Sequence, residues 1–437
     1  MTGTDQGRAI ERVECFVVSH DLDPRTGPSI ALSSSHAYAL VKVTDTDGRS
    51  GWGETYLVPG IPAIVESVAP ALIGRSAQRT RQLATDIRWN AEHSYAASAM
   101  TIAVEDLRAR QLGISVAASF GGPVRERVRL YAAFGGYVEG VDPEDSWPGD
   151  VERVLAAGFT AMKFRVGRYP VAHEAALLEE IRSSLPDDVV LMADGNAGYT
   201  LPRAIEMGNV LDSLGFRWFE EPLPQRERYA GYEQLAAALD IALAGGEILQ
   251  SRSAAIDLLG RRAVDVVQPE PVICGGVAET LWIAELAGVQ SIAAMPHTSN
   301  NTIGIAAGLQ VLACLPEPTR SPASDELFLE YGVDDNPHRA GLLTEPLAFD
   351  GGWAAIPDGP GLGVEIDEEY LAHHAVETRI VDAAGARTAR PSPRRRSPAR
   401  SPSSAGCRPR RSRRSRTRAG SRAAGHGTAS ITSWPSS

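Results

Sequence analysis

Six residues with side chains that can bind metal ions or transfer protons each follow a short apolar run in the middle of the chain. They are separated by 23 to 31 residues: Lys163, Asp194, Glu220, Glu247, Glu270 and His297. Each separation is about the length of one strand–helix unit, and the carboxyl ends of parallel barrel strands converge on one mouth, where chemistry takes place. The spacing therefore predicts that these side chains meet in one site.

Three of these residues, Asp194, Glu220 and Glu247, are carboxylates from consecutive units with no basic residue among them. Held together they would repel one another strongly. A hard divalent cation relieves that repulsion, and Mg²⁺ prefers oxygen ligands while keeping positions open for substrate, so we predict one Mg²⁺ ion here. The alternative for any single acid is a helix cap or a solvated strand end.

Lys163 and His297 are candidates for acting on a substrate. Apart from Lys42, Lys163 is the only lysine in a chain whose other cationic residues are arginines, which indicates a need for a compact ammonium group. Chance retention of the lysine is the alternative. His297 is a candidate base because imidazole titrates near neutral pH. Glu270 lies one unit earlier and is suitably placed to orient the ring; a purely structural histidine is the alternative.

Short apolar runs alternate with amphipathic segments between residues 131 and 335. The runs are typical of buried strands, and stretches such as HEAALLEEIRSSL and GVAETLWIAELAG are compatible with helices. Repeated strand–helix units of this number predict an α/β fold with a parallel sheet closed into a barrel.

The chain before and after this region follows other patterns. In residues 1–130, AYALVKV, an Asp47-Gly48 turn and GWGET predict a β-hairpin, and TIAVEDLRARQLG predicts a helix that ends at Gly113. Residues 336–382 are too few for a domain, so they are expected to pack onto another part of the chain.

The charge is distributed unevenly. All 54 acidic residues precede residue 383, whereas 14 of the 43 basic residues follow it. An acidic body argues against nucleic-acid binding by the folded part. Residues 383–437 are rich in Arg, Ser and Pro, which predicts a disordered tail. The alternatives for this tail are a basic arm that binds nucleic acid or an anionic surface, an inert extension, or a stretch read out of frame.

Several function classes are excluded by composition. No apolar run approaches the roughly 20 residues of a membrane span. The polar first residues lack the apolar stretch of a signal peptide, so we expect a cytoplasmic protein. Four widely spaced cysteines do not match metal or disulfide patterns and are expected to be free thiols: Cys15, Cys274, Cys314 and Cys407.

Ten short motifs occur in the order found in the mandelate racemase and acid-sugar dehydratase branch of the enolase superfamily, which the chain resembles over residues 9–370. They are GWGET, TIAVEDLRARQLG followed by FGG, MKFRVG, MADGNAGYT, WFEEPL, GGE, QPE, CGG, MPH and IPDGPGLG. The resemblance implies a modified (β/α)7β TIM-like barrel at 131–335 under an α+β capping domain. Residues 1–130 and the returning segment 336–382 would build the cap, and a homo-oligomer is expected.

The resemblance also implies residue roles. The three strand-end carboxylates would hold Mg²⁺, with Glu220 rather than its neighbour Glu221 as ligand, and Asn196 would lie near the metal and substrate. Lys163 would neutralise the substrate carboxylate, and His297, oriented by Glu270, would act on the α-carbon proton. A further acid matches the one that hydrogen-bonds the enediolate: Glu330, in LFLEY.

Two departures from the family pattern matter. The usual Lys-x-Lys is here Lys163-Phe164-Arg165. Guanidinium stays protonated, so Arg165 is a poor base and suits the binding of a carboxylate or hydroxyl group. Glu270 stands in QPE where Asp is usual, so the geometry of the histidine pair must adjust to one more methylene.

With one competent base, the favoured reaction is dehydration of a sugar acid (an aldonate or aldarate) to a 2-keto-3-deoxy acid. The segments LFLEY and PDGPGLGVEI also resemble acid-sugar lactone cycloisomerases, which is the close alternative. A racemase or epimerase would need a second base opposite His297. A metal-binding relative without turnover is the alternative from a different class.

Overall fold

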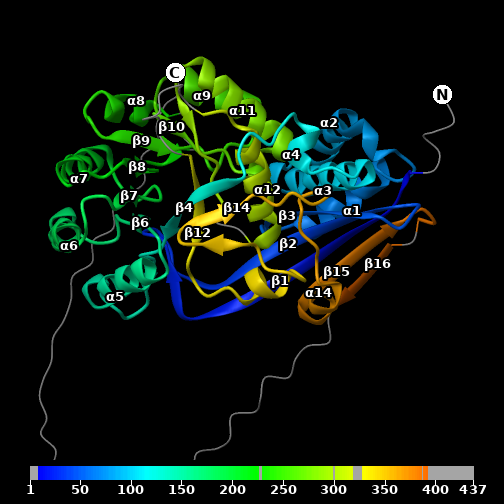
Figure 1. The fold of residues 1–437 in the computed structure, drawn as a ribbon, viewed down its shortest axis with the longest axis horizontal. Helices are drawn as coiled ribbons and strands as arrows, with labels where there is room; N and C mark the ends of the chain where they lie inside the picture. Colours follow the sequence, from blue (N-terminus) through cyan, green and yellow to red (C-terminus); the bar gives the residue numbers. More distant parts are fainter. Residues whose placement is uncertain (1–7, 226–228, 299–300, 318–326, 386, 392–437) are drawn as a thin grey trace, which may run out of the picture. The chain divides into compact units, whose positions relative to one another are not determined.

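The computed structural model describes residues 8–225, 229–298, 301–317, 327–385 and 387–391. These residues form an antiparallel sheet with its own helices, which is the cap, and a barrel of parallel strands surrounded by helices (Figure 1). Residues 392–437 and Cys407 lie outside the described residues, so the predicted disorder of the tail stays a prediction there.

The cap is built on a sheet with the strand order β16-β15-β1-β2-β3. Strand bounds are β1 Ile10–Gly27, β2 Ser33–Asp45, β3 Ser50–Tyr56, β15 Ala375–Asp382 and β16 Arg387–Pro391. The predicted hairpin is confirmed: β2 pairs antiparallel with β3, and Gly48 in the turn has φ +82°. Strand β15 pairs antiparallel with β1 over Arg12↔Asp382 to Val18↔Ala375, so the returning segment joins the cap.

Strand β16 corrects the boundary predicted for the tail. Residues 387–391 pair antiparallel with β15 and extend the cap sheet beyond residue 383. The composition pointed to disorder because the segment has few apolar side chains. Pairing of an edge strand depends on backbone N–H and C=O groups, which every non-proline residue carries, so composition alone did not reveal it.

Within the part of the chain that the structure describes, three helices cover the cap sheet: α1 Ile61–Val68, α2 Thr80–Ala91 and α3 Ser94–Leu112. The end predicted for α3 is confirmed, because Gly113 caps it at φ +70°. Gly51 and Gly53 of β3 permit close packing of this helix, since a Cβ at either position would collide with a backbone carbonyl oxygen of α3. The glycines of GWGET therefore let β3 and α3 approach closely.

The barrel has eight parallel strands within the described residues: β4 Arg127–Ala133, β6 Ala161–Arg165, β7 Val190–Asp194, β8 Trp218–Glu220, β9 Ala242–Gly245, β10 Val266–Val267, β11 Ala293–Ala294 and β12 Phe328–Gly332. They pair in sequence from β4 to β11, and β12 pairs with β4, which brings the last strand beside the first. A helical segment follows each of the first seven strands: α5 Pro143–Ala156, α6 Val171–Ser184, α7 Leu201–Ser213, α8 Ala230–Ala236, α9 Arg252–Gly260, α10 Pro271–Cys274 with α11 Val277–Val289, and α12 Thr302–Cys314. This is the expected (β/α)7β order.

Smaller elements complete the body: α4 Val116–Ser119, β5 Tyr137–Val138, α13 Pro337–Gly341, β13 Phe349–Asp350, β14 Trp353–Ala355 and α14 Glu368–His374. One apolar core fills the barrel and its contact with the cap, and a second lies between the cap sheet and its helices. Three cysteines are free thiols, as predicted: Cys15, Cys274 and Cys314. Among the described residues, no helix is long and apolar enough to cross a membrane.

Candidate active site and metal centre

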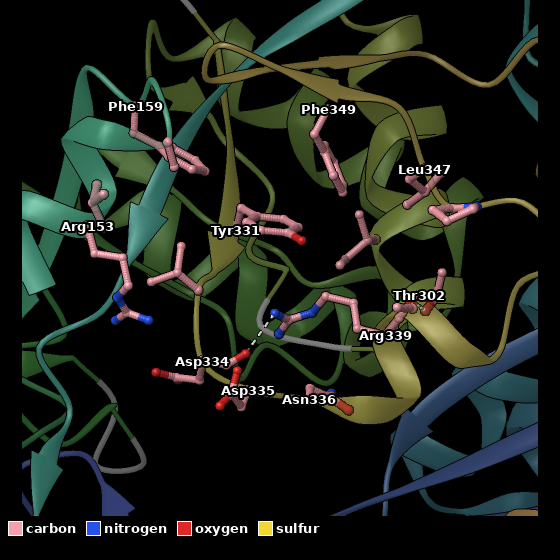
Figure 2. Close-up of a pocket in the computed structure, with 16 residues that line it drawn as sticks. Arg153, Phe159, Thr302, Tyr331, Asp334, Asp335, Asn336, Arg339, Leu347 and Phe349 are labelled. Carbon is pink, nitrogen blue, oxygen red and sulfur yellow. Dashed lines mark hydrogen bonds between the residues drawn. The ribbon is translucent and has the colours of Figure 1, made fainter.

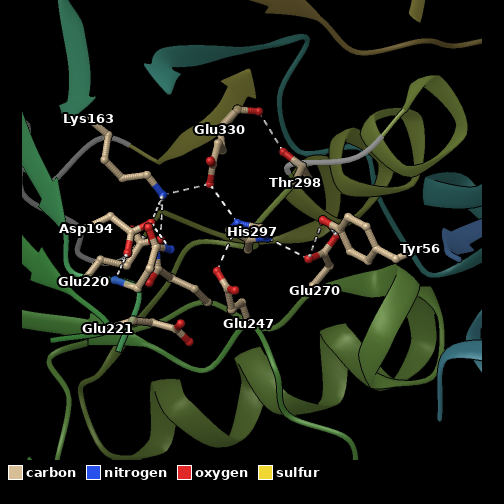
Figure 3. Close-up of polar contacts among 12 residues, drawn as sticks. Tyr56, Lys163, Asp194, Glu220, Glu221, Glu247, Glu270, His297, Thr298 and Glu330 are labelled. Atoms are coloured by element: carbon tan, nitrogen blue, oxygen red, sulfur yellow. Dashed lines mark hydrogen bonds and ion pairs between the residues drawn. The ribbon is translucent and has the colours of Figure 1, made fainter. Parts of the chain in front are cut away.

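The structure brings the predicted residues together at the carboxyl ends of the barrel strands (Figure 3). Asp194 and Glu220 are the last residues of β7 and β8, and Lys163 and Glu330 lie within β6 and β12. The remaining three follow within three residues of the ends of β9, β10 and β11: Glu247, Glu270 and His297. Short parallel strands in register thus convert a regular sequence spacing into one cluster.

Lys163 is 1% exposed and lies among carboxylates. Its Nζ is 2.5 Å from Glu220 Oε1, 3.1 Å from Glu330 Oε2 and 3.6 Å from Asp194 Oδ2. Burial opposes a charged ammonium, but Glu220 and Glu330 outweigh it and raise the pKa of Lys163 well above its usual value. The side chain is therefore a fixed positive charge at the site.

Glu220 is fully buried and held by several donors. Besides Lys163, Trp218 Nε1 donates to its Oε2 at 3.1 Å and Gln268 Nε2 donates to the same oxygen at 2.8 Å. Its neighbour Glu221 has φ +38° and accepts a hydrogen bond from Gln225. The two adjacent acids therefore have different partners, and Glu220 is the one bonded to Lys163.

His297 is paired with Glu270. Its Nδ1 lies 2.6 Å from Glu270 Oε2, and its Nε2 lies 3.1 Å from Glu247 Oε2 and 3.3 Å from Glu330 Oε2. Burial opposes protonation of the ring, but these three carboxylates outweigh it and raise the pKa of His297 well above 6.5. The carboxylate at Nδ1 fixes the ring so that Nε2 faces the other acids.

Glu330 links the two ends of the cluster. Its Oε2 accepts hydrogen bonds from Lys163 and from Tyr131 Oη at 3.0 Å, and Thr298 Oγ1 donates to its backbone oxygen at 2.8 Å. Burial alone would raise its pKa, but the surrounding cations lower the pKa of Glu330 to about 2, His297 and Lys163 foremost. Lys163 and His297 thus reach the same carboxylate oxygen from two directions.

The carboxylates fit a hard divalent cation. Within the described residues, one group brings metal-ligating atoms within 4.8 Å of one another: Glu220, Glu247 and His297. Burial raises the pKa of Glu247 to about 7, and the carboxylates of Asp194 and Glu220 add to this. Carboxylates close enough to raise the pKa of Glu247 are crowded negative charges, which a dication would stabilise. Asp194 lies outside this group and is held at Lys163 and Asn196.

Arg165 and Asn196 lie beside Asp194. Asn196 donates to both carboxylate oxygens of Asp194, from its backbone N at 2.8 Å and its Nδ2 at 2.9 Å. Arg165 Nη1 donates to Asn196 Oδ1 at 2.9 Å and lies 3.9 Å from Asp194 Oδ2. Tyr137 Oη donates to the backbone oxygen of Arg165 at 3.1 Å. A guanidinium therefore stands where the family pattern places a lysine.

The cap contacts the loops that carry these residues. Ser29 Oγ, near the tip of the β1–β2 hairpin, donates to Gly195 O at 2.8 Å, beside Asp194. Glu54 of β3 is fully buried and accepts hydrogen bonds from the backbone N–H groups of Asn301 at 2.7 Å and Ile303 at 3.1 Å. Its carboxylate thereby caps α12, the helix that follows His297.

Sequence analysis missed three side chains of the site: Tyr56, Tyr131 and Gln268. Tyr56 Oη donates to Glu270 Oε1 at 3.0 Å and Oε2 at 3.2 Å. Tyr56 ends the GWGET strand and Tyr131 lies in β4, far in sequence from their partners, so no local spacing marked them. Gln268 is the first residue of QPE and was available as a motif residue.

A separate cavity of about 440 Å³ is shown in Figure 2. It is next to the strand β12 and the helices α5, α12 and α13. The described residues that line it include no predicted site residue; they are chiefly Arg153, Phe159, Thr302, Tyr331, Asp334, Arg339 and Phe349. The chemistry-bearing cluster and this cavity are therefore distinct.

Comparisons with known proteins agree with this architecture. The model of the mandelate racemase / muconate lactonizing enzyme N-terminal domain matches residues 13–121, and that of the enolase C-terminal domain-like family matches residues 149–370. D-galactarolactone cycloisomerase of Agrobacterium fabrum is 33% identical over 374 residues, which cover 83% of this chain and 97% of the relative. Arabinonate dehydratase of Saccharolobus solfataricus is 27% identical, over 80% and 95% of the two chains.

A solved structure extends the likeness to three dimensions. L-talarate/galactarate dehydratase from Salmonella typhimurium LT2, liganded with Mg and L-lyxarohydroxamate, superposes with a TM-score of 0.77 at 26% identity, over 87% of this chain and 96% of that one. The relatives are dehydratases and cycloisomerases, which are lyases and isomerases. The chain is an enzyme that belongs to the mandelate racemase / muconate lactonizing enzyme family of the enolase superfamily.

Proposed function

We propose that this enzyme removes the proton α to the carboxylate of a sugar acid and dehydrates the acid to a 2-keto-3-deoxy acid. One observation carries the proposal. Lys163 Nζ and His297 Nε2 both reach the same oxygen, Glu330 Oε2, at 3.1 and 3.3 Å. An ammonium and a base therefore act within the span of one small carboxylic acid.

The difficulty of the reaction explains this arrangement. A proton next to a carboxylate is barely acidic, because its removal places a second negative charge on the oxygens. Lys163 would neutralise the carboxylate as that charge develops, and Glu330 would hydrogen-bond the enediolate. His297 Nε2 would take the proton once the carboxylates that raise its pKa are neutralised, while Glu270 holds the ring and stabilises the imidazolium that forms.

Asp194, Glu220 and Glu247 would hold Mg²⁺. Their crowding and the raised pKa of Glu220 and Glu247 support this assignment. When bound, the ion supplies Lewis-acid stabilisation of negative charge on the substrate carboxylate. The relative with the TM-score of 0.77 is liganded with Mg, which supports the same ion here.

Arg165 favours elimination over inversion. Racemisation needs a second base on the face opposite His297, and a guanidinium remains protonated at ordinary pH. Arg165 and Asn196, hydrogen-bonded at 2.9 Å, would instead bind the hydroxyl or second carboxylate groups of the substrate. After proton removal, the protonated His297 is the acid available to assist departure of the β-hydroxyl group.

Lactone cycloisomerisation is the second candidate, favoured by the 33% identity to D-galactarolactone cycloisomerase. The two reactions share the α-proton step and differ in the group that leaves. When the β-oxygen belongs to a lactone, the leaving group is a carboxylate, which departs without a proton. A site with one acid–base residue serves this reaction at least as well.

The test uses aldonates, aldarates and aldarolactones with Mg²⁺, and follows α-proton exchange in deuterated water by NMR together with release of keto acid. A dehydratase forms keto acid from open-chain acids, and a cycloisomerase does so from lactones alone. Exchange with inversion and no keto acid would replace both by an epimerase. His297→Asn should abolish exchange, with a loss of at least about 10²–10⁴-fold. Absence of exchange and product across the whole set would leave a metal-binding relative without turnover.

A further inference from the structure

The last three residues of β3 contact three barrel segments around His297. Glu54 caps α12 through the N–H groups at its start. Thr55 Oγ1 donates to Val272 O in α10 at 2.7 Å, and Tyr56 Oη donates to Glu270 at 3.0 and 3.2 Å. Helix α10 begins directly after Glu270. This cap strand is therefore attached to the barrel on both sides of the histidine pair.

The Glu270 side chain depends more on contacts with other residues to fix its conformation than an aspartate side chain would. Its side chain has one more rotatable bond, and fixing each such bond carries an entropic cost. The residue is fully buried, and the side-chain donors to its carboxylate among the described residues are Tyr56 and His297. The phenol spans both oxygens, which leaves Oε2 directed at His297 Nδ1 at 2.6 Å (Figure 3).

We propose that Tyr56 is a positioning residue: its hydroxyl holds the longer Glu270 side chain in the rotamer that aligns His297 for proton transfer. The proposal rests on the proposed function for the role of His297 and adds a residue from the cap to the acid–base apparatus. It also gives a physical reason why the glutamate at position 270 can serve where the family pattern has aspartate. Residues that orient a functional histidine through its carboxylate partner commonly change activity by about 10–100-fold.

The test is a double-mutant cycle between Tyr56→Phe and Glu270→Asp. In the Glu270 enzyme, Tyr56→Phe should lower kcat about 10–100-fold with KM nearly unchanged. Glu270→Asp withdraws the carboxylate by one methylene from the phenol, so adding Tyr56→Phe to that variant should have little further effect. Such non-additivity identifies residues that act through one another.

The matched control is Tyr38→Phe. Tyr38 lies opposite Tyr56 in the β2–β3 register, with ring centroids 6.2 Å apart, and its hydroxyl is 3.5 Å from Asn336 Nδ2. This variant also removes a phenol hydroxyl from the cap sheet, but one that does not contact Glu270. It should keep kcat within about twofold of wild type, since the contacts of Glu270 with Tyr56 and His297 are retained.

A crystal structure of the Tyr56→Phe variant separates this proposal from the proposed function. Glu270 should rotate and lose its contact with His297 Nδ1, whether or not any sugar acid is turned over. A wild-type enzyme that acts on no acid or lactone would refute the function alone. The role of Tyr56 would be overturned if Glu270 did not move or if the two substitutions had additive effects in the cycle. It would also be overturned if Tyr56→Phe raised KM and left kcat unchanged, which would make Tyr56 a substrate-binding residue.

Discussion

Replacing Lys163 with methionine removes the ammonium that lies within 3.6 Å of the Asp194, Glu220 and Glu330 carboxylates, with little change in side-chain volume. Loss of one partner from a buried charged cluster costs about 3–5 kcal/mol. The loss should be larger at pH 8 than at pH 6, because carboxyl groups whose pKa is raised take up protons at the lower pH and limit the repulsion. A body of this size unfolds with an entropy of about 0.8 kcal/mol/K, so the melting temperature should fall by about 4–6 °C at pH 8.

The assay is thermal unfolding in EDTA and in MgCl₂. Without the ammonium, the carboxylates should bind Mg²⁺ more tightly, and Mg²⁺ at 100 times its Kd adds about 2.7 kcal/mol, or about 3 °C. The chain offers a matched control in its other lysine. Lys42 is also buried and pairs with Glu368 at 2.6 Å, but that glutamate is largely exposed.

Because the exposed Glu368 carboxylate is solvated by water when its partner is removed, Lys42→Met should lower the free energy of unfolding by no more than about 1 kcal/mol. It should leave the effect of Mg²⁺ on the melting temperature unchanged. Equal melting temperatures for the two variants in EDTA would refute the reasoning that Lys163 balances the carboxylates. The absence of any response to MgCl₂ in both variants would refute the metal assignment.

Three further outcomes are expected. Arg165→Lys should raise KM and lower activity, because the guanidinium fork that contacts Asn196, and that we propose binds substrate, is lost. Faster inversion at the α-carbon would instead reveal a second base. Burial raises the pKa of Glu105 to about 7, so the folded state holds this proton more tightly than the unfolded chain and stability falls as pH rises from about 4.5 to 7. Glu105→Gln should remove about 3 kcal/mol of that fall in stability. If the melting temperatures of the variant and the wild type changed with pH by the same amount, this expectation would be contradicted. Truncation after Pro391 should leave the melting temperature unchanged, whereas truncation at Ala383 removes β16 and should lower it.

Much of the site follows from the sequence because a parallel barrel repeats one unit. Asp194 and Glu220 end short apolar strands and Glu247 follows one, and neighbouring strands place their carboxyl ends at the same mouth. Regular spacing in the chain therefore becomes proximity in space without any knowledge of the long-range packing. The hairpin at Gly48 and the end of α3 at Gly113 were equally local, since each depends on a glycine with positive φ.

The tertiary structure alone decided which groups act on one another across the cap–barrel contact. Tyr56 and Glu270 are 214 residues apart, and their hydrogen bond exists because β3 ends over α10 when the cap packs on the barrel. Glu54 reaches the start of α12 in the same way. Strand β16 was hidden for a related reason, since its pairing uses backbone groups that composition does not distinguish. Periodic local patterns predict which residues share a mouth, whereas contacts between units depend on the packing of whole faces, which no local spacing records.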